Sequence, residues 1–428
     1  MRNRTLRLSF SAALAAISAT VLASIGAAAD SSPAASDDET VQGITITFGG
    51  ADPLPTTRTV QHWFGQTTNP GNGIAYRYNM VGADPATNGS ATLGVDIIPI
   101  DVKVQGVSFR GSDRVAGVLA SPLFQTNDYS NTDRITTAAG TVSPPGPFAL
   151  SDGNTGQLID ATMRAQFDKV GSAYHVILDT PTVYEPVTID VNSDNGVVNA
   201  TRLGLLRARV DSTWFQTRVQ NLMGRLHLDP THLAVFLTKD VLLYVDHDPM
   251  HCCVFGGHGA GHATGGENGP VSANGDEPIQ TFVWSSWLTP GLLPPAQWVN
   301  KDVSGLTHEI TEWAADPFVT NTVQPWTAPN APQYGCSDIL ETGDPTFNIG
   351  FSAGHNTFDP LTLPNGQPNM FVDGAYHVQD EAFLPWFMRT DPNNTSQTNQ
   401  SGTGGRYTLM GDLTPTPFTW LRQPAPAC

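Results

Sequence analysis

The chain has 428 residues and a formal net charge of −18, although only 14% of its residues are charged. Such an acidic protein is a poor partner for nucleic acid or for an anionic membrane surface, because both carry dense negative charge. Its 41 glycines and 33 prolines argue against a helical bundle and against a disordered acidic tail. We therefore expect an α+β fold that is rich in strands and loops.

The first 29 residues predict a secretory signal peptide. Arg2, Arg4 and Arg7 precede a short apolar run rich in alanine, and residues 27–29 form a small-x-small cleavage pattern. The polar residues 30–40 predict a disordered linker. No later stretch has the length and apolar character of a membrane span, so we expect a secreted or periplasmic protein.

Residues 41–205 predict a β-rich N-terminal part. ITITFGG, TVQHWFG, IAYRYNMVG and ATLGVDIIPIDVKVQGVSFRG alternate apolar and polar residues between Pro, Gly and Asn. One helix is expected at residues 157–170, and strands follow it in YHVILDTPTVYEPVTIDV.

Residues 206–428 predict an α+β part. Asp211 or Ser212 caps a helix with one apolar face, and residues 232–245 predict two strands joined at 238–240. A glycine-rich loop with four histidines follows, then a strand at FVWSSWL. The segment AYHVQDEAFLPWFMR predicts a packed helix or strand, with His377 or Glu381 as minor site candidates.

The four cysteines predict two disulfides, since export places the chain in an oxidising environment. The neighbours Cys252 and Cys253 are expected not to bridge each other, because bonds between adjacent cysteines are strained. We therefore expect one of them to bond Cys336 and the other to bond Cys428.

The stretch VSGLTHEITEWAADP, residues 303–317, predicts the helix around which the site is built. Apolar residues repeat at helical spacing, Asp302 or Ser304 is the expected N-cap, and Pro317 ends the helix. His308 and Glu312 are four residues apart and so lie one turn apart on the same face.

An imidazole and a carboxylate on one helical face can bind a divalent metal such as zinc, and Glu309 beside them could deprotonate a metal-bound water. The pattern is H-E-x-x-H with glutamate in place of the second histidine. The alternative is an ordinary solvated helix face without a metal.

A third metal ligand is expected from another segment. Glu341 in YGCSDILETGDP is the first choice and Asp344 the second, while Asp316 and His258 are further candidates. The alternatives are that Glu341 and Asp344 only hold a turn, and that His258 lies in a flexible surface loop.

Three segments, CCVFGGHGA, THEITEWAADPFVTN and GCSDILETGDP, resemble a family of uncharacterised secreted bacterial proteins and are distantly similar to the exordium or phosphate-induced proteins of plants. The resemblance covers roughly residues 232–390 and implies that the three segments belong to one site. It implies no established activity. The matching residues are His308, Glu309, Glu312, Asp316, Pro317, Glu341, Gly343, Asp344, Cys253, Gly257 and His258.

The H-E-x-x-E pattern is also weakly similar to the zincin-type metallopeptidases. That resemblance implies a zincin-like C-terminal part in which His308, Glu312 and Glu341 bind zinc and Glu309 is the general base. A single histidine among oxygen ligands would equally suit calcium. We predict a secreted, zinc metallopeptidase-like hydrolase acting on a peptide or cell-wall substrate. The alternative is a non-enzymatic extracellular or cell-wall-associated binding protein that keeps the helix as scaffold.

Overall fold

The computed structural model describes residues 58–69, 71–129, 135–137, 140–142, 153–262, 278–293, 298–327, 336–391, 407–410 and 425–428. The predicted signal peptide, the linker at 30–40 and the ITITFGG strand lie outside these residues. Within them the fold is α+β and rich in strands, as the sequence predicts. None of the described helices combines the length and the apolar character that a membrane crossing requires.

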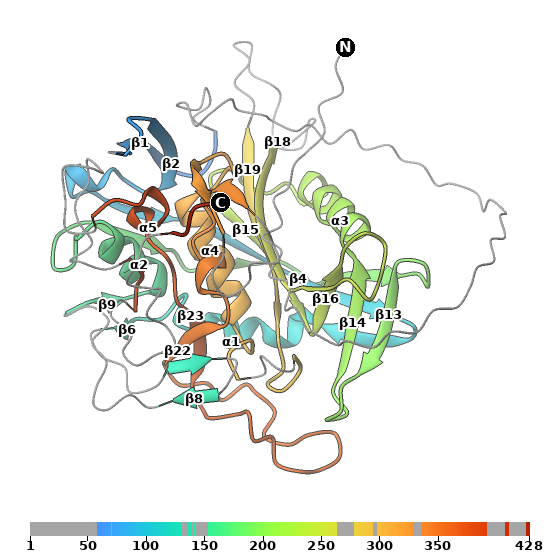
Figure 1. Cartoon of the computed structure of the whole chain (residues 1–428). Helices are drawn as coiled ribbons and strands as arrows, with labels where there is room; N and C mark the ends of the chain where they lie inside the picture. Colours follow the sequence, from blue (N-terminus) through green and yellow to red (C-terminus); the bar gives the residue numbers. More distant parts are fainter. Residues whose placement is uncertain are drawn as a thin grey trace, which may run out of the picture.

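A mixed seven-stranded sheet lies at the centre of the molecule (Figure 1). Its strands are β4 (Val95–Val104), β5 (Val107–Arg110), β11 (Thr182–Val183), β12 (Val187–Val191), β15 (Leu233–Lys239), β18 (Gly256–His262) and β19 (Ile279–Trp287). The order is β11-β4-β15-β19-β18, and β12 and β5 also pair with β4. β4, β15 and β19 are mutually parallel, whereas β18 is antiparallel to β19 at the end of this order.

The middle strands are almost entirely buried, as expected for a parallel sheet that is covered on both faces. Helix α4 (Ser304–Ala315) packs against β18 and β19, and helix α3 (Ser212–Arg225) lies on the other side of the sheet (Figure 1). Alternate residues of β15 enter two different core clusters: Val235 joins the cluster under α4, and Phe236 joins the cluster under α3. The first cluster contains residues from both sides of residue 205, where the sequence predicts a division of the chain.

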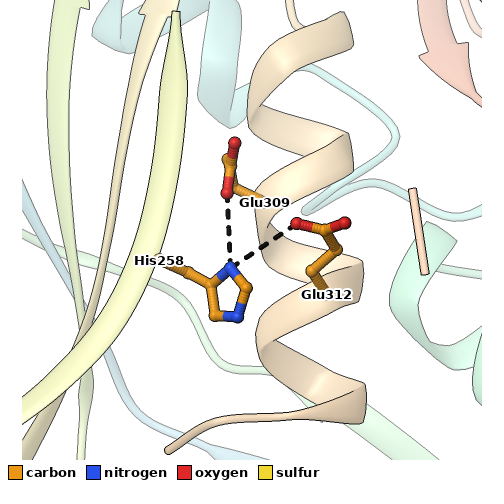
Figure 2. Close-up of side chains that lie close together, drawn as sticks. All are labelled: His258, Glu309 and Glu312. Carbon is orange, nitrogen blue, oxygen red and sulfur yellow. Dashed lines mark hydrogen bonds and ion pairs between the residues drawn. The ribbon is translucent and has the colours of Figure 1, made fainter. Parts of the chain in front are cut away.

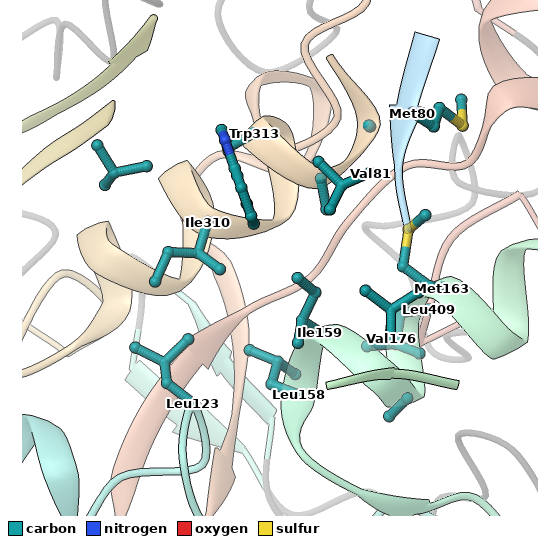
Figure 3. Packing of buried hydrophobic residues seen from close by; sticks show 14 of the residues in the cluster. Met80, Val81, Leu123, Leu158, Ile159, Met163, Val176, Ile310, Trp313 and Leu409 are labelled. Carbon is teal, nitrogen blue, oxygen red and sulfur yellow. The ribbon is translucent and has the colours of Figure 1, made fainter. Parts of the chain in front are cut away.

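The larger core lies between α4 and helix α2 (Leu158–Gln166). Ile310 and Trp313 of α4 point into it toward Leu158 and Ile159 of α2 (Figure 3). This apolar face of α4 has the helical spacing that the sequence predicts, and it fixes the rotation of α4 so that Glu309 and Glu312 face His258 of β18.

Smaller sheets surround the central one. A four-stranded sheet has the order β13 (Gly196–Ala200), β14 (Leu206–Asp211), β16 (Val241–Tyr244), β17 (Cys252–Val254). A second has the order β23 (Tyr376–Gln379), β22 (Ile349–Ala353), β7 (Ile135–Thr137), β8 (Gly140–Val142). The two-stranded pairs are β1 (His62–Thr68) with β2 (Ala75–Val81), β3 (Ser90–Leu93) with β10 (His175–Leu178), β6 (Asn127–Asp128) with β9 (Thr155–Gly156), and β20 (Thr322–Trp326) with β21 (Ser337–Ile339).

Several predicted elements are confirmed, with changed limits. The helix expected at 157–170 is α2, which ends at Gln166, and the strands expected at 232–245 are β15 and β16. Asp211 caps α3 as predicted, because its side chain accepts a hydrogen bond from Trp214 N. The remaining helices are α1 (Val115–Leu119), α5 (Leu384–Met388) and the 3₁₀ turns Pro85–Thr87, Gly111–Arg114 and Asp344–Thr346.

The prediction of a glycine-rich surface loop is wrong for the first half of that segment. Residues 252–254 and 256–262 form β17 and β18, and β18 joins the central sheet. Glycine is needed there, because a Cβ atom on Gly256 would overlap the side chain of Glu309. The glycines of β18 have no side chains, so β18 can approach α4 closely. In the sequence, the same glycines indicate a turn or loop and give no sign of this approach.

The predicted disulfide pairing is also wrong. Cys252 bonds its neighbour Cys253, and Cys336 bonds Cys428. The second bond joins two segments that both pair with Trp326: Ser337 follows Cys336, and Ala427 precedes Cys428. Their Cα atoms are 5.8 Å apart, which is a usual spacing for a disulfide.

Asp302 is not the N-cap of α4, and neither is Ser304. The N-cap position is Val303, and no side chain caps the helix there. Asp302 instead accepts hydrogen bonds from the backbone N of His377 and from its Nδ1, both at 2.9 Å. It thereby ties the start of α4 to β23.

His377 makes this tie sensitive to pH. Its Nε2 lies 3.2 Å from Asp373, whose carboxylate is also 3.7 Å from the ammonium group of Lys301. Burial lowers the pKa of His377, but the charge and hydrogen bond of Asp302, with the hydrogen bond to Asp373, outweigh burial and raise it.

We therefore expect the His377 contact to stabilise the fold fully below about pH 6.5, the usual pKa of histidine, and to lose this effect as the pH rises through the raised pKa. The free energy of unfolding of the wild type and of His377→Gln should be measured between pH 6 and pH 9. The difference between the two proteins should shrink as the pH rises. A constant difference would contradict the assignment.

Candidate functional site

All twelve residues of α4 are buried, including His308, Glu309 and Glu312. This excludes the alternative of a solvated helix face. The helix lies under β18, and the segment after β21 closes over its polar face with Glu341 and Asp344. Three parts of the chain that are far apart in sequence therefore place titratable side chains in one buried region.

His308 faces three carboxylates. Its Nε2 lies 3.1 Å from Glu312 Oε2, 3.7 Å from Asp344 Oδ1 and 3.9 Å from Glu309 Oε1. The Nε2 atom is buried and makes no hydrogen bond of acceptable geometry in the described part of the chain, despite the short distance to Glu312.

His258 of β18 reaches the same carboxylates from the opposite side. Its Nδ1 lies 3.4 Å from Glu309 Oε2 and 3.5 Å from Glu312 Oε2 (Figure 2). Its Nε2 lies 3.9 Å from Glu341 Oε2. In Figure 2 the two glutamates project from α4 toward the imidazole on the neighbouring strand.

Backbone contacts hold Glu312 and its surroundings in place. Gly343 N donates a 3.0 Å hydrogen bond to Glu312 Oε1, and Gln379 Nε2 donates to Gly343 O. Gly343 also lies close against the His308 ring, since a Cβ atom there would lie 2.5 Å from His308 Nδ1. The loop that carries Asp344 is thus fixed to both α4 and β23.

His258, His308, Glu309, Glu312, Glu341 and Asp344 together form the titratable cluster. Its electrostatics are dominated by burial and by an excess of carboxylates. Burial and repulsion from Glu312 raise the pKa of Asp344 to about 8. Burial likewise raises the pKa of Glu309. The pKa of Glu312 is lowered, because the charge and contact of His308 outweigh the effect of burial. Burial alone would lower the pKa of His308, but its carboxylate neighbours raise it well above the usual value.

The structure brings together His308, Glu309 and Glu312 and adds Asp344 beside His308 and Glu341 beside His258. Asp316 has a different position. Its carboxylate accepts hydrogen bonds from Thr320 N and Asn321 N, so it closes the turn after α4. Burial raises its pKa to about 7.

Three histidines of the glycine-rich segment have side chains that the structure describes, and they lie apart. His258 is buried in the cluster, whereas His247 and His251 are exposed and face Asp211 and Asp246. The side chain of His262 lies outside the described residues. Glu381 is fully buried nearby and accepts a hydrogen bond from Thr342 Oγ1. Its only signal in the sequence is its place beside core aromatic residues.

Solvent reaches the cluster at Asp344. The side chain of Asp344 is 19% exposed, whereas those of both histidines and the other carboxylates are at most 5% exposed. An open cavity of about 730 Å³ lies elsewhere, at the beginning of β4 and β15, and no side chain of the cluster lines it. Its lining includes Thr59, Gln61, His62, Gly94, Asp179 and His232.

The donor atoms have the spacing of metal ligands. Four ligands at 2.0–2.1 Å in a tetrahedron around zinc are about 3.4 Å apart. The distances of 3.1–3.9 Å within the cluster lie around this value, and most exceed the usual length of an N–H···O hydrogen bond. Two triads have donor atoms that all lie within 4.8 Å of one another: His308, Glu312 and Asp344, and His258, Glu309 and Glu312.

Comparison with known proteins gives no relative. No protein-family model matches the chain, and neither a curated protein nor a solved structure matches it. The resemblance to the secreted bacterial family and to the exordium proteins therefore stays a prediction, and the functional argument has to come from the geometry of the cluster.

The close contact of Gly343 with His308 can be tested by substitution. Gly343→Ala should lower the free energy of unfolding by about 1–3 kcal/mol, as overpacking of a buried site does. Gly224→Ala in α3 is a matched control, because nothing lies within 4 Å of a Cβ atom there. It should be neutral or stabilise by up to about 1 kcal/mol, since alanine favours helix. Chemical denaturation measures both, and equal effects would contradict the described packing.

Proposed function

We propose that this protein is a metal-dependent hydrolase, similar in its chemistry to a zinc metallopeptidase. One observation carries the proposal: the two buried imidazoles of His258 and His308 lie at ligand spacing from the carboxylates of Glu309 and Glu312 on α4. Such a concentration of perturbed titratable groups is typical of functional sites.

His308, Glu312 and Asp344 are the proposed ligands of the metal ion. Asp344 takes the place first given to Glu341, because its Oδ1 lies 3.7 Å from His308 Nε2 whereas the ion-pair contact of Glu341 is with His258. Asp344 is also the ligand nearest to solvent, which favours an open coordination position on its side. An open position is what separates a catalytic zinc site from a structural one.

The excess negative charge supports a bound cation. The ion pairs that Glu309, Glu312 and Asp344 form in the described part of the chain are all with the two histidines. Burying ionised carboxylates without compensating charge is strongly unfavourable. A divalent cation would supply that charge. Imidazole nitrogen among the donors favours zinc or another transition metal over calcium, which prefers oxygen throughout.

A zinc ion at this site would polarise a substrate carbonyl group and lower the pKa of a water molecule. Glu309 is the proposed general base, because its Oε1 faces the His308 side of the cluster and can accept a proton from that water. Its environment suits a general base, because burial raises its pKa. Burial keeps bulk water away from the other groups, whose side chains are at most 5% exposed.

Peptide or cell-wall material is the proposed substrate class, and the N-terminal signal pattern supports action outside the cytoplasm. The competing function is a non-enzymatic extracellular binding protein in which α4 is only a scaffold. That alternative does not explain why carboxylates and imidazoles are buried face to face at ligand spacing.

Elemental analysis of the purified mature protein tests the metal site. The wild type, after reconstitution with zinc, should contain at least one equivalent that His308→Ala no longer holds. His247→Ala is a matched control, because His247 is 77% exposed and lies outside the cluster. A wild type without zinc, or a His308→Ala protein with the same zinc content, would contradict the proposal.

The role of Glu309 is tested by Glu309→Gln, which keeps the shape of the side chain and removes the base. Hydrolysis of a quenched-fluorescent peptide library should fall by about 100-fold or more, as expected for loss of a general base. The zinc that depends on His308 should remain. Unchanged turnover would assign the proton transfer to another group.

A further inference from the structure

Glu312 belongs to both triads of the cluster, and this shared position goes beyond a site for one metal ion. We propose that the cluster binds two divalent cations, with Glu312 bridging them. The first lies in the triad of the proposed function, and the second is held by His258, Glu309 and Glu312. The inference rests on that function for the first ion. The second ion can be disproved without affecting the first.

The bridging atom is Glu312 Oε2. It lies 3.1 Å from His308 Nε2 on one side and 3.5 Å from His258 Nδ1 on the other. It is buried and accepts no hydrogen bond within the described part of the chain. The other oxygen, Oε1, is engaged by Gly343 N at 3.0 Å. The backbone thus fixes the carboxylate so that its unengaged oxygen lies between the two imidazoles.

The second triad is a built site. His258 is fully buried, and its Nδ1 lies 3.4 Å from Glu309 Oε2 and 3.5 Å from Glu312 Oε2, close to the spacing of tetrahedral zinc ligands. Each donor comes from a rigid element: His258 from β18 in the central sheet, and both glutamates from α4. Gly256 allows the close approach of the two elements.

Glu341 has a place in this arrangement. With a cation on His258 Nδ1, the ring proton is on Nε2, and Nε2 faces Glu341 Oε2 at 3.9 Å. A carboxylate on the far side of a metal-binding imidazole orients the ring and increases its basicity. Glu341, which the sequence suggests as a ligand, thus faces His258 at ion-pair distance, longer than a hydrogen bond.

The charges agree with two cations. Glu309, Glu312, Glu341 and Asp344 would supply four negative charges once cations displace their protons, which equals the charge of two divalent cations. Glu309 presents one oxygen to each half of the cluster: Oε2 faces His258, and Oε1 lies 3.9 Å from His308 Nε2. Binding of the second cation through Oε2 leaves Oε1 directed toward the first.

Two ions at such a bridge are about 3.5–4 Å apart and can stabilise both the attacking and the leaving oxygen of a displacement. This spacing also provides a direct physical signature. Two Mn²⁺ ions bridged by a carboxylate couple magnetically, whereas an isolated Mn²⁺ ion gives a simple six-line electron paramagnetic resonance spectrum.

Metal stoichiometry and Mn²⁺ resonance of the mature protein test the proposal together. The wild type should bind two equivalents of zinc by titration calorimetry and give a coupled Mn²⁺ spectrum. His258→Ala should bind one equivalent and give the six-line spectrum. Glu309→Gln, which changes no side-chain volume, should also lose the second equivalent and keep the first. His232→Ala, at the separate cavity, should behave as the wild type.

The outcomes separate the two proposals. A single equivalent in the wild type that His308→Ala removes would overturn the second ion and leave the metal-dependent function intact. The second ion would also be overturned, with the metal-dependent function intact, if His258→Ala and Glu309→Gln both keep the wild-type stoichiometry. No bound metal in the reconstituted wild type would overturn both. The wild-type count and the Glu309→Gln count remain decisive if His258→Ala fails to fold.

Discussion

The close packing of α4 against β18 is the contact on which the candidate site depends. It brings a glutamate pair on the helix to within 3.4–3.5 Å of an imidazole on the strand, in a region closed to solvent. The approach requires glycine at Gly256, where a side chain would meet Glu309, and at Gly305, where a side chain would meet Phe255. On the opposite side, Ile310 and Trp313 anchor α4 in the larger core (Figure 3). Apolar packing thus supplies the stability that holds an unfavourable set of charges together.

The sequence predicts the parts of the site that are local. The helix at 304–315, the shared face of His308 and Glu312, and the position of Glu309 beside them follow from a period of 3.6 residues. The strands β15 and β19 and the cap of α3 by Asp211 are equally local signals. These predictions hold because short-range spacing alone determines which side chains share a face of one element.

The remaining parts depend on how distant segments meet. Asp344 and Glu341 are three residues apart, and only the path of the chain between β21 and β22 puts Asp344 against His308 and Glu341 against His258. His258 is one of four histidines in a segment whose glycines suggest a loop, and the strand forms because those glycines fit beneath α4. The disulfide pairing likewise depends on Ala427 adding to Trp326, which no cysteine spacing encodes.

The balance of charge connects this fold to its proposed chemistry. A protein selected only for stability would fill the space between α4 and β18 with apolar side chains, since replacing buried ion pairs in this way is often neutral or stabilising. Here the same space holds two imidazoles and several carboxylates, with Glu312 Oε2 accepting no hydrogen bond in the described part of the chain. A bound cation would offset this unfavourable burial of charge. It would also bind tightly, because ligands already held at the required spacing need little rearrangement. Folding and metal binding should therefore be linked, with the metal stabilising the contact between α4 and β18 that creates its own site.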